Sequence, residues 1–295
     1  MTRSLVAGVL GALLLPAMAL ANPAPFTVTK GVSVKASGVT NLTVDCPRDA
    51  TALAGAVVSR STGVTVRDSL PTDSWRWVFR FTGLAGATNA RARAAVRCLR
   101  LDPAAGTRRW KLSNFTGTRT VRLPPLASRE VRVRCLSAYI ATGYGISRAG
   151  AGAPRPLPPG DALVAAAIPA RRSFLLRLEN PGGDTVRVTA NVRCLSRTAS
   201  AKRNGTTVTQ RFAVARPGFS DRVATGERRV VRHRCPAGHT SLATGLSLPV
   251  RDDIFMTGSH AAGPRGGRWF FNHPAGGPQR VRTWLTCLSL RTGFK

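Results

Sequence analysis

Apolar and polar residues alternate one by one along much of the chain after residue 21. The strongest stretch is residues 75–81, where Trp75, Trp77, Phe79 and Phe81 occupy every second position. The same alternation occurs at residues 91–98, 131–135, 186–194, 231–235 and 281–287. A period of two predicts strands with one buried face. Because no stretch after residue 21 has a helical period, we expect an all-β fold.

A pattern of paired cysteines occurs three times. Cys46, Cys135 and Cys235 each end an early alternating segment, and Cys98, Cys194 and Cys287 each end a later one. The first cysteines lie 89 and 100 residues apart, and the second ones 96 and 93. A repeat of this length has the size of a domain. The sequence therefore predicts three tandem β-sandwich modules, immunoglobulin-like or jelly-roll-like, at residues 22–103, 113–198 and 205–295.

One disulfide within each module is expected from the same repeat. Six cysteines allow about 15 pairings, and the repeat selects Cys46–Cys98, Cys135–Cys194 and Cys235–Cys287. Residues 1–21 have the charged start, short apolar segment and small-residue end of a secretory signal peptide. Export would place the cysteines in the oxidising surroundings where disulfides persist, in preference to free buried thiols.

Three segments break the alternation. Residues 101–118 and 196–205 are predicted to be linkers, and residues 148–161, rich in proline, glycine and alanine, to be an inserted loop. Gly55, Gly143 and Gly245 follow the first cysteine of each repeat at similar distances, which predicts tight turns or bulges with a positive φ.

The charge is strongly basic. The chain has 44 lysine and arginine residues against 13 acidic ones, a formal net charge of +31. Lysine occurs only at positions 30, 35, 111, 202 and 295, so nearly all the basic residues are arginine. The abundance of alanine, arginine, glycine and proline suggests a GC-rich bacterial genome, but codon bias does not explain the shortage of carboxylates. The excess exceeds what solubility needs, so a polyanionic partner is expected.

The arginines fall at alternate positions of the predicted strands. Residues i and i+2 share a face about 6.5–7 Å apart, close to the separation of successive phosphates along a strand. Guanidinium groups bind phosphate, sulfate and carboxylate through paired hydrogen bonds. Because the opposite faces are apolar, we expect the arginines to point outward. The candidate polyanion-binding residues are Arg91, Arg93, Arg97, Arg132, Arg134, Arg187, Arg193, Arg232 and Arg234.

These features predict an exported, non-catalytic binding protein of the bacterial periplasm, cell surface or extracellular matrix. Its ligand would be lipopolysaccharide, acidic polysaccharide or extracellular DNA, bound with avidity by three modules. The alternative is a structural subunit of a surface layer, appendage or secretion assembly with an acidic protein partner. A steep loss of binding with salt would favour the first. No nucleic-acid-binding motif is present, so specific DNA or RNA recognition is not expected.

Catalysis has little support in the sequence. Motifs of serine hydrolases, zinc peptidases and nucleotide-binding loops are missing. His233, His239, His260 and His273 all lie in the third module with Asp252 and Asp253, which leaves a hydrolase site there as a third interpretation. The histidine spacing matches no tight metal motif, and we expect neither a metal nor another cofactor. No apolar segment after residue 21 is long enough to span a bilayer.

Overall fold

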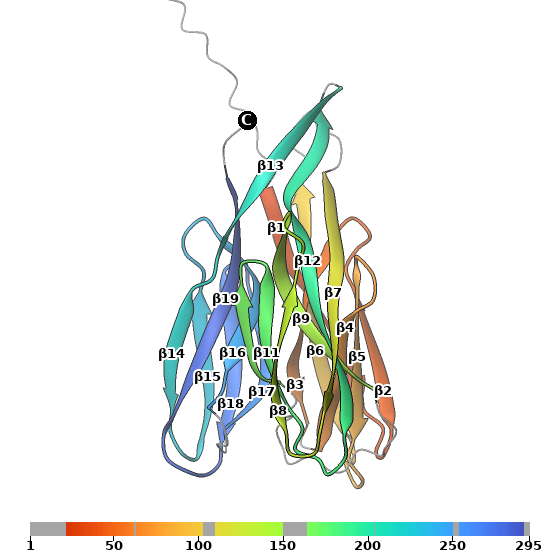
Figure 1. The fold of residues 1–295 in the computed structure, drawn as a ribbon, viewed down its shortest axis with the longest axis vertical. Helices are drawn as coiled ribbons and strands as arrows, with labels where there is room; N and C mark the ends of the chain where they lie inside the picture. Colours follow the sequence, from red (N-terminus) through yellow and green to blue (C-terminus); the bar gives the residue numbers. More distant parts are fainter. Residues whose placement is uncertain are drawn as a thin grey trace, which may run out of the picture.

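A computed structural model describes residues 22–61, 63–102, 110–149, 164–203, 205–249 and 254–291 (Figure 1). These residues form an all-β fold, as the alternation predicted, and the described part of the chain includes no helix that could cross a membrane. The expected signal peptide (1–21), most of the expected inserted loop (148–161), and Asp252 and Asp253 lie outside the described residues.

The strands fall into three repeats with the same order along the chain. Repeat 1 contains β1 (Asn22–Ser33), β2 (Val39–Asp45), β3 (Thr51–Arg60), β4 (Val64–Pro71), β5 (Arg76–Gly83) and β6 (Arg91–Asp102). Repeat 2 contains β7 (Lys111–Leu123), β8 (Ser128–Arg134), β9 (Tyr139–Ala149), β10 (Val164–Ala170), β11 (Ser173–Glu179) and β12 (Val186–Arg203). Repeat 3 contains β13 (Thr206–Ala215), β14 (Gly218–Val223), β15 (Glu227–Arg234), β16 (Thr240–Ser247), β17 (Phe255–Ala262), β18 (Gly266–His273) and β19 (Gln279–Arg291).

Strand pairing follows one antiparallel scheme in every repeat. In repeat 3, β13 and β14 both pair with β19 and are counted together as the first strand. The last strand of each repeat then lies between the first and third, giving β1-β6-β3, β7-β12-β9 and β14-β19-β16. The fifth strand lies between the second and fourth, giving β2-β5-β4, β8-β11-β10 and β15-β18-β17. Each repeat therefore contains two groups of three strands, and β13 additionally joins β12 to β19.

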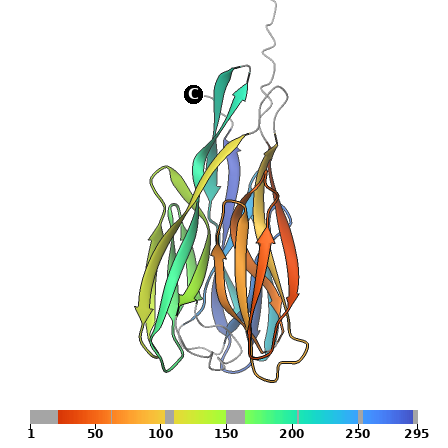
Figure 2. The ribbon, with the colours of Figure 1, turned by 90° about the vertical axis from the view of Figure 1, so that its right-hand side faces the viewer.

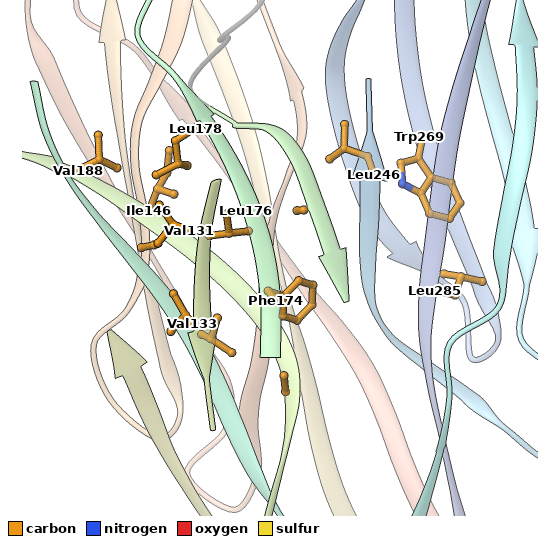
Figure 3. Close-up of a cluster of buried hydrophobic side chains, with 14 of the residues drawn as sticks. Val131, Val133, Ile146, Phe174, Leu176, Leu178, Val188, Leu246, Trp269 and Leu285 are labelled. Carbon is orange, nitrogen blue, oxygen red and sulfur yellow. The ribbon is translucent and has the colours of Figure 1, made fainter. Parts of the chain in front are cut away.

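A disulfide links the two groups of strands in each repeat. The predicted pairs Cys46–Cys98, Cys135–Cys194 and Cys235–Cys287 are confirmed, and the described residues contain no free cysteine. Large aromatic side chains fill the interior beside them, because the alternation directs Trp77, Phe174 and Trp269 inward. Figure 3 shows part of this core, with Phe174 between strands of repeat 2 and Trp269 in repeat 3.

The three repeats contact one another in a closed ring. The fourth strand of each repeat lies against the third strand of another: β4 pairs with β9, β10 pairs with β16, and β17 packs on β3. Figures 1 and 2 show the repeats standing side by side, with their strands along the long axis. A shared core fills the centre, with contributions from all three repeats: Leu53, Leu99, Ile140, Leu195, Leu242 and Leu288.

Glycine permits the close approach of strands at these junctions. Gly55, Gly143 and Gly245 lie inside β3, β9 and β16 without a positive φ, so the predicted turns are wrong, although the strand register shifts, as at a bulge, one to three residues before each glycine. A Cβ atom at Gly245 would lie 2.6 Å from the Ala167 carbonyl oxygen of β10. At the junction of β17 with β3, a Cβ at Gly258 would lie 2.7 Å from the Val58 carbonyl oxygen. The physical requirement is space between strands, which local sequence does not reveal.

The segments expected to be linkers are partly strand. β12 continues through residues 196–203 and forms a hairpin with β13, which projects beyond the repeats at the top of Figure 1. Ala199, Ala201 and Phe212 are buried there and pack with the shared core. The sequence predicts a linker there because small alanines alternating with polar residues carry little apolar signal. β7 likewise begins at Lys111, inside the other expected linker.

Candidate functional site

Seven of the nine predicted arginines are exposed, and two are buried. The exposed ones are Arg91, Arg93, Arg132, Arg134, Arg187, Arg232 and Arg234. Arg97 and Arg193 keep only 4% and 3% of their surface exposed. The prediction that these two point outward to a ligand is therefore wrong, and they are unavailable to a polymer.

The burial of Arg97 and Arg193 follows from the ring. On β6, residues 91, 93, 95 and 97 share one face, which changes from exposed to buried toward the disulfide. On β12, residues 187, 189, 191 and 193 change in the same direction, as do residues 280, 282, 284 and 286 of β19. A neighbouring repeat covers the buried end of each row. Alternation identifies the face correctly but does not show that another repeat lies over half of it.

The buried arginines join one repeat to the next. Arg97 of repeat 1 donates from Nε to the Ser241 carbonyl oxygen (2.9 Å) and from Nη2 to the Pro264 carbonyl oxygen (3.3 Å), both in repeat 3. Arg193 of repeat 2 donates from Nη2 to the Asp73 carbonyl oxygen of repeat 1. Pro264 and Asp73 occupy equivalent turns, between the fourth and fifth strands of their repeats. These bonds hold the ring at two of its three junctions.

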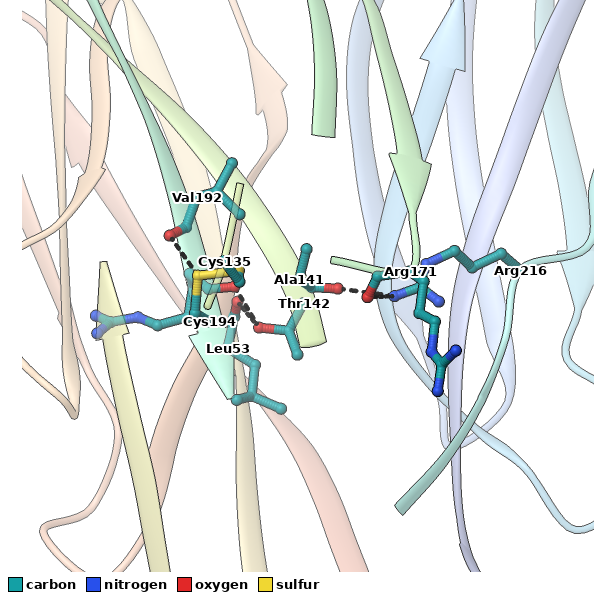
Figure 4. Close-up of a disulfide and its surroundings, with 9 residues drawn as sticks. Leu53, Cys135, Ala141, Thr142, Arg171, Val192, Cys194 and Arg216 are labelled. Atoms are coloured by element: carbon teal, nitrogen blue, oxygen red, sulfur yellow. Dashed lines mark hydrogen bonds between the residues drawn. A yellow bond between two sulfur atoms is a disulfide. The ribbon is translucent and has the colours of Figure 1, made fainter. Parts of the chain in front are cut away.

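A third arginine completes the ring from a different position. Thr286 stands where Arg97 and Arg193 stand in the other repeats, one residue before the second cysteine. Arg216, between β13 and β14, instead joins repeat 3 to repeat 2. Its Nη2 donates to the carbonyl oxygens of Ala141 (3.2 Å) and Arg171 (3.1 Å) in repeat 2. Figure 4 shows the Arg216 guanidinium reaching toward the strand that carries Ala141. Sequence reasoning missed Arg216, because it lies outside the repeated pattern.

Desolvation sets the electrostatics of these three guanidinium groups. Burial lowers the pKa of Arg97, Arg193 and Arg216 each to about 10. Within the described residues, none of the three forms an ion pair. Backbone carbonyl oxygens and neutral side chains satisfy part of their hydrogen-bonding capacity instead. Their role is to join repeats.

Exposed arginines also face each other across neighbouring strands. The register places Arg122 opposite Arg187, Arg222 opposite Arg280, and Arg232 opposite Arg268. Side chains directly opposite have Cβ atoms about 4.5–5.5 Å apart. All six are exposed, and within the described residues no carboxylate pairs with any of them. We call these three the arginine pairs.

Repeat 1 shows the contrasting arrangement. On its β2-β5-β4 group, Arg76 bonds Asp45 at 2.8 Å, and Arg80 bonds the buried Asp68 at 3.0 Å. Carboxylates thus neutralise this surface within the protein itself. The arginine pairs, by comparison, concentrate positive charge on repeats 2 and 3.

Four members of the arginine pairs were missed in the sequence: Arg122, Arg222, Arg268 and Arg280. One signal was available, because arginine occurs seven residues before the second cysteine of every repeat, at Arg91, Arg187 and Arg280. The partner on the neighbouring strand depends on strand register. Register is set by long-range pairing that single-sequence alternation does not specify.

The histidines of repeat 3 are not gathered into one site. His273 is buried and pairs in register with Glu227 at the start of β15, whereas His239 follows the end of that strand. His273 Nε2 donates to the Gly277 carbonyl oxygen at 2.8 Å. His233 Nε2 contacts Asp221 Oδ2 at 2.8 Å. Among the described residues, no three metal-ligating side chains lie together.

Comparison of the chain with protein-family models gives no match, and comparison with curated proteins gives no similar sequence.

Proposed function

We propose that the chain is an exported, non-catalytic protein of the bacterial envelope or extracellular matrix that binds anionic polymers through exposed arginines. In this proposal, residues 22–103, 113–198 and 205–295 form three β-sandwich modules that display the arginines on a rigid ring. Three disulfides support export, because disulfides persist in oxidising compartments. Lipopolysaccharide, acidic polysaccharide and extracellular DNA share the anionic groups that guanidinium binds.

The arginine pairs are the observation that carries this proposal. Like charges directly opposite on neighbouring strands destabilise a sheet. The ion pairs of Arg76 and Arg80 in repeat 1 show that this chain can place carboxylates beside arginine. An anion bound between two guanidinium groups would remove their repulsion and accept hydrogen bonds from both. Such pairs are therefore better suited to an external anion than to solubility alone.

The position of the pairs favours a long ligand. Arg122–Arg187 lies on repeat 2, and Arg222–Arg280 and Arg232–Arg268 lie on two different groups of strands in repeat 3. A polymer that contacts one pair raises the effective concentration of its other charges near the next pair. A polymer that contacts several arginine pairs can then bind tightly even though each contact is weak.

The test measures binding of the purified chain to a duplex DNA probe and to heparin from low to high salt. We expect binding at low salt and a linear fall of log affinity with log salt, with a slope of about 0.9 per neutralised DNA phosphate. The variants R122Q/R187Q, R222Q/R280Q and R232Q/R268Q each remove one pair. Each should lower the DNA slope by about 1 to 2 units, because each removes two phosphate contacts.

The matched control is R129Q/R172Q, which removes two exposed arginines that do not face another arginine in the register. It changes the net charge equally and should leave most of the slope unchanged. Absence of binding by the wild-type chain, or equal effects of all four variants, would reject the proposal. Binding of an acidic protein that persists in high salt would instead support a structural subunit.

A further inference from the structure

Two hollows adjoin each other at Arg60 and Ser61, at the end of β3. The first has a volume of about 570 Å³ and lies on repeat 1, where Arg91 and Arg93 of β6 meet Ser59 of β3. The second has a volume of about 440 Å³ and lies between repeats 1 and 3. Arg60 and Ser61 line both hollows, so together they form one groove. Both volumes lie within the range of ligand sites in proteins.

The first hollow offers positive charge and hydrogen-bond donors. Arg91 and Arg93 are exposed on the same face of β6, and neither forms an ion pair within the described residues. Ser33 lies opposite Arg91, and Ser59 lies opposite Arg93, on the two strands that flank β6. Two guanidinium groups with nearby hydroxyls are chemistry suited to a phosphate group.

The second hollow has an apolar wall. Leu84 of repeat 1 lines it together with Val230 and Phe270 of repeat 3. Val230 is 43% exposed, one of few large apolar side chains with that exposure among the described residues. Phe270 stacks on His260, with the ring centroids 5.7 Å apart, which holds its ring in place. A ligand with a charged group but no apolar part would leave this wall in contact with water.

We propose that the groove binds an anionic amphiphile, with its phosphate on Arg91 and Arg93 and its apolar chain along Val230, Leu84 and Phe270. Arg60 lies where the two halves meet, and Arg228 adds positive charge beside the apolar wall. The groove thus offers positive charge for the head group at one end and an apolar wall for the chain at the other. This inference rests on the proposed function, since it requires that exposed arginines of this chain bind anions.

Alkyl phosphates test both halves of the groove separately. Binding of inorganic phosphate, butyl phosphate and octyl phosphate is measured by titration calorimetry, with the esters kept monomeric. Burial of each methylene favours binding about fourfold at most. Because the groove is open, we expect octyl phosphate to bind about tenfold or more tightly than butyl phosphate. Octyl maltoside, which has the chain without the charge, should bind more weakly than octyl phosphate.

Matched variants locate the two contacts. R91Q/R93Q should weaken both esters together, whereas R132Q/R134Q, which removes two arginines that are also exposed, on β8, should change neither. Val230→Ser should lower the preference for octyl over butyl phosphate severalfold without weakening butyl phosphate. Its control is Val39→Ser on β2, because Val39 is 42% exposed and lies outside the groove. Circular dichroism checks that every variant is folded.

The outcomes separate this inference from the proposed function. Equal affinity for octyl and butyl phosphate, with DNA and heparin still bound, would overturn the amphiphile and leave the polyanion proposal standing. Failure to bind DNA and heparin would overturn both. If Val230→Ser weakened a single-stranded DNA probe as much as it weakens octyl phosphate, the apolar wall would be a base-stacking surface, and the amphiphile would be rejected.

Discussion

Arginine has two different roles in this protein, and the surroundings of each side chain decide which. Arg91 and Arg97 lie six residues apart on the same face of β6, yet one is exposed and the other is 4% exposed. The buried one loses hydration, which lowers its pKa to about 10, and instead donates hydrogen bonds to carbonyl oxygens of repeat 3. Residue type and alternation are identical at both positions, so sequence reasoning assigned them one role.

We predict that Arg97→Ala destabilises the protein by about 2–4 kcal/mol. Removing the guanidinium leaves the Ser241 and Pro264 carbonyl oxygens and the Thr27 hydroxyl without this donor, at about 1–3 kcal/mol for each group that stays dry. Urea unfolding followed by fluorescence measures the change. Arg93→Ala, on the same face but exposed, should stay within about 0.5 kcal/mol of wild type. Equal effects of both variants would contradict the joining role of Arg97.

Strands and disulfides were predictable from the chain because their signals are local. Alternation identifies the strands around each cysteine, and the repeated, similar spacing of the cysteines selects the correct pairing among the alternatives. The contacts between repeats could not be predicted in this way. Arg97 meets a residue 144 positions away, and nothing in the neighbourhood of either residue marks the other. The repeated glycines are visible in the sequence, but it predicts turns or bulges there because the sequence does not show which strands of another repeat lie against them.

At the scale of elements, we predict that Gly245→Ala weakens the junction of β16 with β10. The new Cβ would lie 2.6 Å from the Ala167 carbonyl oxygen and 2.7 Å from Pro169 Cδ, so backbone must move. We expect a loss of about 1–3 kcal/mol in unfolding free energy, measured by urea denaturation. Gly277→Ala is the control, since its Cβ meets nothing within 4 Å and its φ is not positive. An unchanged free energy of unfolding in Gly245→Ala would show that β16 and β10 can separate enough to accept a Cβ atom without cost.

At the scale of the molecule, the shared core joins the three repeats, and we expect the ring to unfold as one cooperative structure. Leu195 belongs to this core with residues of all three repeats, whereas Leu178 belongs to a cluster formed by repeats 2 and 3. A substitution at Leu195 therefore removes contacts that hold the whole ring together. One at Leu178 leaves the contacts of repeat 1 in the shared core intact.

We predict that Leu195→Ala costs about 2–5 kcal/mol and accelerates hydrogen exchange in β3, β9 and β16 alike. Leu178→Ala should cost a similar amount but leave exchange in β3 close to wild type. Hydrogen exchange followed by mass spectrometry, with peptides from each repeat, makes the comparison. If Leu195→Ala accelerated exchange in repeat 2 alone, the three repeats would be independent units.

Arg216 has a consequence for how such a ring can change by mutation. In a homotrimer, one substitution alters all three interfaces at once, so a destabilising substitution weakens every interface. In this single chain each junction changes alone, so the buried Thr286 affects only the junction that Arg216 serves. The carbonyl acceptors of the turn stay the same while the donor moves to another strand connection. Because the three repeats are covalently linked, they need not keep the same sequence. Each repeat can change its own surface without dissociation of the ring.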